Sequence, residues 1–348
     1  MKTRIACIDL AKGFTVFFMA PIHAMLLFGK PEVRDTVLGS VFRLIAEGTG
    51  AQLLMIIMGI NFYRSTNMRF HVALRRAGLM LIAGYLLNAW KFVISTYLGI
   101  MPANFLLEME ASNNTEGLVK LFMTGDIFHF AGLAFLVLYL LSLITRNSIV
   151  FICFAAVICI CSYFVFDVKF DQLIVHHLCQ LLMGQPPTVF FPLVPWLVYP
   201  LVGFALGKFI KDGSGIGSFG LPGIVLMLVG SMMSQYLFPC HELSFYNSCA
   251  GHTIRSVGIA MAWLALWDMA ASMVRSNILF DMLRYLGRNI SLVYVIQWML
   301  LAWLLPLIGY QTLDYLLTVY VVLAINVHVI GFVFIVKQLN PATRRFNV

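Results

Sequence analysis

The chain has 348 residues, of which 61% are hydrophobic and 11% are charged, and its mean hydropathy is +0.90. Soluble domains carry about 25% charged residues, so this composition excludes a soluble globular protein and indicates an integral membrane protein. The net charge of +8 is explained by basic residues that face anionic lipid on one side of a membrane, and it gives no reason to expect a nucleic-acid partner.

The apolar segments predict ten transmembrane helices. Most contain about 20 residues, which is enough to cross a hydrocarbon core of roughly 30 Å, and open sheets cannot satisfy their backbone groups in lipid. In chain order the predicted spans are 5–28, 46–63, 73–98, 124–145, 147–166, 191–210, 220–238, 253–274, 285–305 and 312–336. No polar linker or internal repeat divides them, so residues 1–348 are expected to form one all-α polytopic membrane domain.

The distribution of basic residues predicts the orientation of these spans, because cytoplasmic loops collect Lys and Arg. With an inner N-terminus, fifteen of the 23 basic residues fall in inner segments, and seven, Lys91 among them, are assigned to outer segments. Lys12 is the remaining one and lies within a span. Both termini are therefore predicted to be cytoplasmic.

The first span contains three ionisable side chains, Asp9, Lys12 and His23. A charged residue near the bilayer centre costs about 2.5 to 3.5 kcal/mol, so such residues usually face a protein interior or a wet cavity. Eleven residues make roughly three helical turns, which places Lys12 and His23 on one face about 16 Å apart. This stripe is the first candidate site, with His23 toward the outer end.

Polar residues at the outer ends of two other spans are candidates for the same site. Asp126 and His129 open the fourth span, and Glu47 and Gln52 open the second, so all four could converge with His23. The alternative is that they are interfacial caps and ordinary helix-to-helix hydrogen bonds.

The seven cysteines do not predict a metal site, because they lack the C-x-x-C and histidine spacing of one. Cys240 and Cys249 share a predicted outer loop, where an oxidising compartment would permit a disulfide, and the sequence leaves that bridge open.

Four motifs in order along the chain resemble a known family. They are Arg4-x4-Asp9-x2-Lys12-Gly13 followed by His23, the segment 125–135 (GDIFHFAGLAF), the segment 191–196 (FPLVPW) with Gly203 and Gly207, and the segment 286–292 (LGRNISL). Together they resemble the membrane acyltransferase superfamily, and within it a bacterial form of the heparan-alpha-glucosaminide N-acetyltransferase catalytic-domain branch. The resemblance extends from residue 4 to about residue 300.

The chain departs from the family pattern at three places. Lys12 stands where the family has an arginine and cannot offer a planar bidentate fork. Gln297 stands where related sequences often carry a histidine, and it cannot do acid-base work. Lysosomal relatives have an asparagine at the position of His23 and a histidine in the loop that follows, whereas residues 24–46 here contain no histidine.

The resemblance implies an acyltransferase in the bacterial inner membrane. Acetyl-CoA or another acyl-CoA would be the cytosolic co-substrate, with no metal, and a saccharide or glycolipid outside would accept the acyl group on nitrogen or oxygen. His23, alone or with His129 and Asp126, would be the general base or form an acyl-histidine, and Lys12 would stabilise the carrier arm or its carbonyl. The residues expected to hold the CoA phosphates are Lys12, Arg75, Arg76, Arg284 and Arg288. For the arginines, the alternative is plain membrane topology.

Two other functions stay open at this point. A transporter or flippase for a sugar or lipid-linked substrate could use the same intramembrane charges without any chemistry. A structural subunit without activity would be consistent with Lys12 and Gln297. The oligomeric state, a homodimer included, is not determined, because lipid-facing helices are apolar in any case.

Overall fold

The structure is a computed structural model that describes residues 4–65, 69–161, 172–237, 245–246, 248–274 and 277–339. These residues form helices and no strand, although two isolated bridges join Gly29 to Leu313 and Gly125 to Val189. The predicted all-α polytopic membrane fold is confirmed. The residues from Cys240 to 244 and the last nine of the chain are outside the described part.

Nine helical segments of the described chain are long and apolar enough to cross a membrane. They are Ala6–Phe28, Val37–Arg64, Phe70–Tyr97, Ile127–Ile144, Leu193–Lys211, Ile216–Tyr236, Ala250–Met273, Ile290–Ile308 and Tyr315–Leu339. They correspond to nine of the ten predicted spans. The fifth predicted span, 147–166, coincides with the shorter apolar helix Ser148–Cys161, after which residues 162–171 are not described.

Several spans consist of more than one element. In chain order the elements are α1 (Ala6–Phe28), η1 (Pro31–Asp35), α2 (Val37–Ala46), α3 (Ala51–Arg64), α4 (Phe70–Asn88), η2 (Ala89–Val93), α5 (Ile94–Tyr97), α6 (Ala103–Glu108), α7 (Thr115–Phe122), α8 (Ile127–Ile144), α9 (Ser148–Cys161), α10 (Leu173–Met183), α11 (Leu193–Trp196), α12 (Val198–Lys211), η3 (Ile216–Phe219), α13 (Gly220–Met232), η4 (Met233–Leu237), α14 (Ala250–Met273), α15 (Ile278–Arg288), α16 (Ile290–Ile308) and α17 (Tyr315–Leu339). The elements η2 and η4 are π-helical turns, which often mark functional positions.

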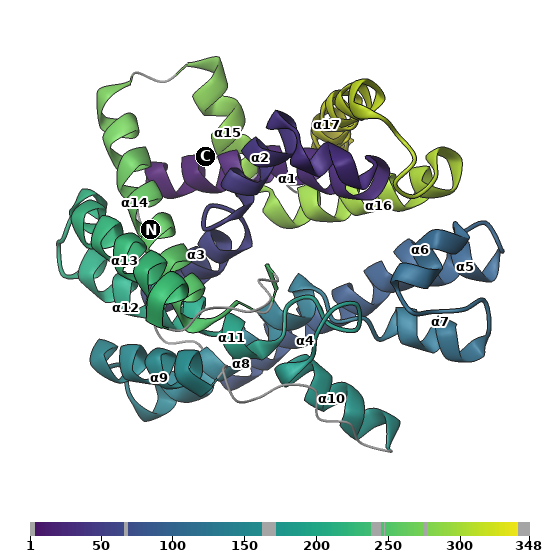
Figure 1. Cartoon of the computed structure of the whole chain (residues 1–348). Helices are drawn as coiled ribbons and strands as arrows, with labels where there is room; N and C mark the ends of the chain where they lie inside the picture. The colour runs from purple at the N-terminus through teal and green to yellow at the C-terminus, as the bar shows by residue number, and fades with distance from the viewer. Residues whose placement is uncertain are drawn as a thin grey trace.

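The helices form an upper and a lower group in the view of Figure 1. The upper group contains α1, α15, α16 and α17, and the lower group contains α4, α8 and α10. The helices α3, α12, α13 and α14 lie at one side of both groups (Figure 1). A hydrophobic cluster built on α3, α8, α9, α12 and α14 forms one core, and a second cluster on α1, α16 and α17 forms another.

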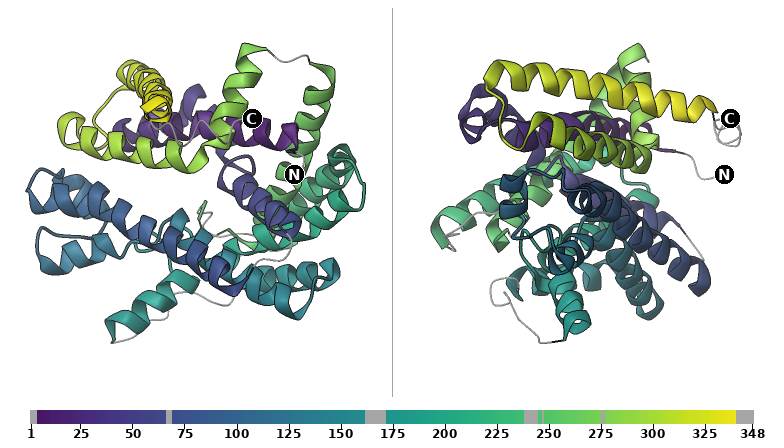
Figure 2. Two further views of the ribbon diagram at one scale, coloured as in Figure 1. Left: turned by 180° about the vertical axis from the view of Figure 1, so that it is seen from behind. Right: turned by 90° about the vertical axis from the view of Figure 1, so that its right-hand side faces the viewer.

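The first and last described helices are antiparallel neighbours. The backbone N–H of Leu313 donates to Phe28 O (2.8 Å), and the N–H of Lys30 donates to Leu313 O (2.9 Å), so the end of α1 lies beside the start of α17. Figure 2 shows the start of α1 and the end of α17 at the same end of the bundle. This arrangement agrees with the prediction that both termini lie on the same side of the membrane.

Glycines allow the closest helix pairs to approach each other. A Cβ at Gly258 of α14 would lie 2.3 Å from the backbone nitrogen of Met227 in α13, and one at Gly203 of α12 would lie 2.0 Å from Ile56 O in α3. Between α1 and α15, a Cβ at Gly13 would lie 1.9 Å from Leu283 O. Small residues at such positions let transmembrane helices gain van der Waals contact that lipid cannot replace.

Two segments differ from the predicted spans. The segment 29–45, between the first two predicted spans, contains η1 and α2, and α2 is a short helix that exposes Val37, Val41 and Leu44. The ninth predicted span, 285–305, merges the end of α15 with α16, because the chain leaves helical geometry at Asn289 and starts again at Ile290. This break lets α15 pack on α1 while α16 crosses the membrane.

Candidate functional site

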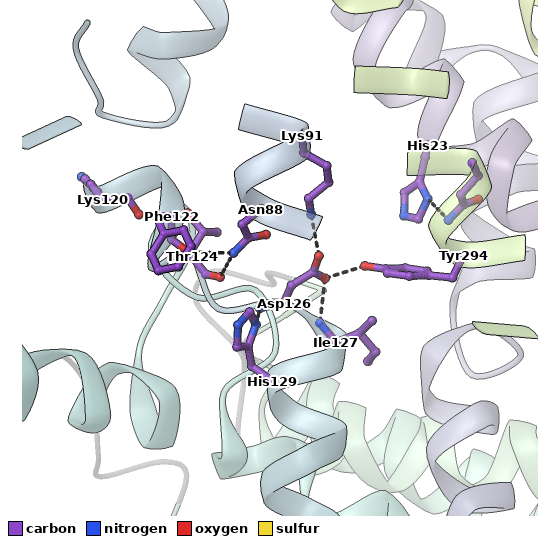
Figure 3. A network of polar contacts seen from close by, with 11 residues as sticks. His23, Asn88, Lys91, Lys120, Phe122, Thr124, Asp126, Ile127, His129 and Tyr294 are labelled. Carbon is purple, nitrogen blue, oxygen red and sulfur yellow. Dashed lines mark hydrogen bonds and ion pairs between the residues drawn. The ribbon is translucent and has the colours of Figure 1, made fainter. Parts of the chain in front are cut away.

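Three buried polar side chains meet between the upper and lower helix groups. Lys91 Nζ lies 2.6 Å from Asp126 Oδ2, and the hydroxyl of Tyr294 donates to Asp126 Oδ1 over 2.6 Å (Figure 3). Their residue exposures are 2%, 7% and 7%. Together with His23 and Gln297 they are called the central polar cluster below. Lys91 comes from η2, Asp126 from the start of α8 and Tyr294 from α16, so the cluster joins both helix groups.

Asp126 occupies the N-cap position of α8 and receives three donors. Besides Lys91 and Tyr294, the backbone N–H of Ile127 donates to its Oδ1 over 2.6 Å. A carboxylate with this many donors has little lone-pair density left for a substrate proton. Asp126 is therefore better suited to holding Lys91 and Tyr294 than to acting as a base.

His129 completes the cap and thereby fixes its own tautomer. Its Nδ1 accepts from the backbone N–H of Asp126 at 3.1 Å, which closes a reciprocal capping box. With Nδ1 acting as the acceptor of a neutral ring, Nε2 carries the proton. That Nε2 is buried and has no hydrogen-bond partner, and the whole residue is 0% exposed. His129 thus presents an unpaired donor.

His23 is the member of the central polar cluster that comes from α1. Its ring is half-buried, its Nδ1 is 3.3 Å from Nε2 of the Gln297 amide, and its ring centroid is 4.9 Å from that of Trp298. The Lys91 ammonium lies over the same Trp298 ring, 4.5 Å from its centroid. The helix α1 continues through Pro21, so the imidazole stays in register with the rest of the stripe. His23 therefore shares one aromatic contact surface with the buried ion pair.

Unpartnered polar atoms gather around the central polar cluster. Gln297 Oε1 and Asn88 Oδ1 are acceptors without a partner, and both residues are 0% exposed. The Asn88 amide nitrogen is satisfied, because it donates to the carbonyls of Phe122 and Thr124. Buried polar atoms normally have partners, and exceptions of this kind are typical of places where a ligand or water binds.

A second polar contact lies on the outer side of the lower group. The Tyr85 hydroxyl is 2.8 Å from His177 Nε2 in α10, and the Tyr85 ring packs edge-on against His129 at 4.3 Å. His177 lies outside the candidate spans, and its burial lowers its pKa, with a smaller contribution from His176. Gly84 leaves room for the His129 ring, since a Cβ there would lie 2.6 Å from it.

Lys12 belongs to a different place, at the inner end of α1. Its Nζ forms an ion pair with Asp9 Oδ1 at 2.7 Å, and Arg288 Nε lies 3.4 Å from Asp9 Oδ2. These side chains line a cavity of about 200 Å³, called the inner cavity below. Its lining consists of Arg4, Ile5, Ile8, Asp9, Lys12, Asn61, Arg64 and Arg288.

The structure divides the residues predicted from the sequence between these two places. His23, Asp126 and His129 gather at or beside the central polar cluster, whereas Lys12 is about 16 Å from His23 along the helix axis, at the inner cavity. At this separation Lys12 could contact a carrier arm that extends from the inner cavity, but not a carbonyl beside the imidazole. Lys91 supplies the cation there.

The predicted phosphate-binding residues are divided as well. Lys12 and Arg288 line the inner cavity, whereas Arg75, Arg76 and Arg284 are not among its lining residues. Arg75 and Arg76 are exposed on α4, and Arg284 forms an ion pair with Asp281 at 3.2 Å. In their place, two cations not predicted for this role complete the lining, Arg4 and Arg64.

Glu47 and Gln52 have other surroundings. Glu47 pairs with Arg255 of α14 at 2.6 Å, and Gln52 is 1% exposed with its Oε1 unpartnered. No contact between either residue and His23 is among those that the structure records for the described chain. Cys249 is disulfide-bonded, and Cys240 lies outside the described residues. Within the described ranges no group of three or more His, Cys, Asp or Glu could hold a metal ion.

Sequence reasoning missed Lys91 and Tyr294. Lys91 falls inside the predicted span 73–98, yet it was grouped with the outer residues. The rule that pointed to Lys12, a charge inside an apolar span, would also have pointed to Lys91. Tyr294 carried no such signal, because a tyrosine near a span end is typical of the interfacial aromatic belt.

Comparison with known proteins decides the family. The family described as heparan-alpha-glucosaminide N-acetyltransferase, catalytic, matches residues 4–248, which is more than two thirds of the chain. The chain belongs to this family. It is thus a multi-pass membrane protein of an acetyltransferase family, as the sequence motifs indicated. Neither the curated proteins nor the solved structures contain a match.

The family match ends before the last helices of the site. Arg288, Tyr294 and Gln297 lie on α15 and α16, beyond residue 248. The acetyltransferase-family segment provides His23, Lys91, Asp126 and His129, and the rest of the chain brings the groups that pair with them. Both parts are therefore needed to build the site.

Proposed function

We propose that the protein transfers an acyl group, acetyl in the first instance, from cytosolic acyl-CoA to an amino or hydroxyl group of an extracytoplasmic saccharide or glycolipid. The bacterial inner membrane is the proposed location. The observation that carries this proposal is the arrangement along α1, which has a cation-lined cavity at its inner end and a half-buried imidazole near its outer end. A thioester donor that crosses part of the membrane requires both.

The inner cavity suits the phosphates of CoA. Four of its lining residues are basic, namely Arg4, Lys12, Arg64 and Arg288. Guanidinium and ammonium groups bind phosphate through short charge-assisted hydrogen bonds. The distance from Lys12 to His23, about 16 Å along the helix, is comparable with the reach of an extended pantetheine arm. The nucleotide would stay at the inner cavity while the thioester reaches His23.

His23 would act as the general base. Half a turn of the Gln297 amide exchanges its nitrogen and oxygen at little steric cost, and Oε1, now buried without a partner, would then accept from His23 Nδ1–H. His23 Nε2 would keep its lone pair and take the proton from the acceptor. The acceptor nitrogen or oxygen forms a bond to the thioester carbon and the C–S bond breaks. The protonated His23 then gives its proton to the CoA thiolate, which leaves as the thiol.

The neighbouring groups would stabilise charge and orient the acceptor. Lys91 would stabilise charge that develops beside His23, because its ammonium and the imidazole contact the same Trp298 ring and a cation in a dry environment stabilises an oxyanion most. The Nε2–H of His129 is a further unpaired donor, and it faces Gly84 of α4. The same groups could support a route through an acyl-histidine. The His23 imidazole would attack the thioester carbon first and release CoA, and the acceptor would then attack the acyl-histidine.

The proposal is tested with purified protein in lipid nanodiscs, radiolabelled acetyl-CoA and a panel of amino sugars. His23→Ala should abolish acetylated product while CoA still binds at the inner cavity. His71→Ala removes an exposed histidine on α4 and should leave turnover unchanged. The acyltransferase is ruled out if the unmodified protein binds CoA without turnover, as an inactive subunit would, or moves sugar into vesicles without acetyl-CoA, as a transporter would.

A further inference from the structure

Asp9 lines the inner cavity and neutralises part of its charge. Among the described residues that line the cavity, four are basic and Asp9 alone is acidic. Its Oδ1 is 2.7 Å from Lys12 Nζ and its Oδ2 is 3.4 Å from Arg288 Nε, so the two oxygens bind two different cations. The carboxylate side chain is 11% exposed.

This geometry resembles that of a bound anion. A carboxylate between an ammonium and a guanidinium uses the same donors that a phosphate oxygen would use. Asp9 and Lys12 share α1, and Arg288 ends α15, where Gly287 lets the two helices touch: a Cβ at Gly287 would lie 2.1 Å from Asp9 O. The backbone thus holds Asp9 close to both cations whether or not a ligand is present.

We propose that Asp9 is a built-in competitor for the anionic end of a phosphorylated ligand. An entering phosphate must take Lys12 and Arg288 from the Asp9 carboxylate, which remains within the cavity as a like charge. The competition lowers affinity for the phosphorylated ligand and so favours release of the spent carrier after transfer. The inference rests on the proposed function only in taking the CoA phosphates as the natural anion of this cavity.

The direction of the expected change in anion affinity distinguishes this proposal from a purely structural role of Asp9. Asp9→Asn removes one negative charge beside four cations, which raises the positive potential of the cavity. Affinity for an anion should therefore increase by about tenfold at low salt, and the gain should shrink as salt screens the charges. If Asp9 only held the cavity in shape, the same substitution would weaken binding.

The experiment measures dissociation constants for CoA and for inorganic pyrophosphate by titration calorimetry in nanodiscs. The variants are Asp9→Asn, Asp9→Glu and Asp281→Asn, the last being a matched charge removal on α15 outside the cavity lining. Asp9→Asn should bind both anions more tightly, and Asp9→Glu and Asp281→Asn should stay within about twofold of the unmodified protein. Equal or weaker binding by Asp9→Asn would overturn the proposal, as would the absence of pyrophosphate binding in every variant.

A second pair of variants covers the case in which Asp9→Asn does not fold. Arg288→Gln lacks one cation, so Asp9→Asn/Arg288→Gln has the same net cavity charge as the unmodified protein. The double variant should bind pyrophosphate more tightly than Arg288→Gln alone, and the reverse order would contradict the competition. If Asp9→Asn binds pyrophosphate more tightly but neither the unmodified protein nor any variant binds CoA, Asp9 is supported as a competitor and CoA is contradicted as the donor.

Discussion

At His23 the proposed chemistry depends on which ring nitrogen keeps its lone pair, and this is coupled to the orientation of the Gln297 amide. The amide is fully buried, and its nitrogen is the atom that the structure records next to Nδ1. After half a turn its oxygen would accept from a protonated Nδ1, which leaves Nε2 free as a base. A residue that looks like the loss of a catalytic histidine in the sequence can thus be the group that orients the remaining one.

Gln297→Leu keeps the size of the side chain but removes this hydrogen bond. Because a hydrogen bond of this kind contributes about 1 kcal/mol, we expect kcat for acetyl transfer to fall about fivefold, with CoA affinity unchanged. Gln297→Glu can only accept from Nδ1–H and should keep kcat near that of the unmodified protein. The measurement is a steady-state assay together with CoA titration. Unchanged kcat in Gln297→Leu would show that the amide does not orient His23.

The elements were largely predictable, because hydrophobicity alone identifies segments that fit a bilayer. The close approach of α13 and α14 could not be predicted, since it depends on which faces of the two helices meet. Gly258 in α14 and Gly223 in α13 oppose each other there, and a Cβ at Gly258 would also lie 2.5 Å from Gly223 O. Glycines scattered through an apolar sequence do not reveal which of them lies at such a crossing.

Gly258→Ala should therefore destabilise the protein by about 1 to 3 kcal/mol, because the new methyl group meets backbone atoms that cannot move aside. Gly331→Ala on α17 is the matched control, since nothing lies within 4 Å of a Cβ at that position. The control should be neutral or slightly stabilising, because alanine favours a helix more than glycine does. Thermal unfolding in lipid nanodiscs measures both. Equal midpoints for the two variants would contradict the close packing of α13 and α14.

At the scale of the whole molecule, the hydrogen bond from Tyr294 of α16 to Asp126 joins the upper and lower helix groups, and the Lys91 ammonium neutralises the Asp126 carboxylate within the lower group (Figure 3). The two apolar cores were within reach of sequence reasoning, because hydrophobic residues must be buried somewhere. The polar contact among Lys91, Asp126 and Tyr294 could not be predicted from the sequence. Lys91 and Asp126 are 35 positions apart and Tyr294 is 168 beyond Asp126, so nothing local in the sequence links them.

Lys91→Met leaves the Asp126 carboxylate buried without its counter-charge and should cost about 3 to 5 kcal/mol of stability. Lys91→Met/Asp126→Leu removes both charges and should recover most of that loss. The control is the exposed pair of Lys120 and Glu110, in which Lys120→Met should cost no more than about 1 kcal/mol. Chemical or thermal unfolding in nanodiscs gives the comparison. If Lys91→Met were as mild as Lys120→Met, the buried ion pair would not contribute to the stability of the protein.

The neighbours of α1 have a consequence for how the protein is made. The helix that carries Asp9, Lys12 and His23 packs against α15, α16 and α17, and these leave the ribosome more than two hundred residues after it. Until then its polar stripe has neither Arg288 nor Gln297 as a partner. During synthesis α1 must therefore wait in the bilayer, or beside the insertion machinery, with its charges incompletely covered. Assembly of the candidate site can finish only when translation is nearly complete.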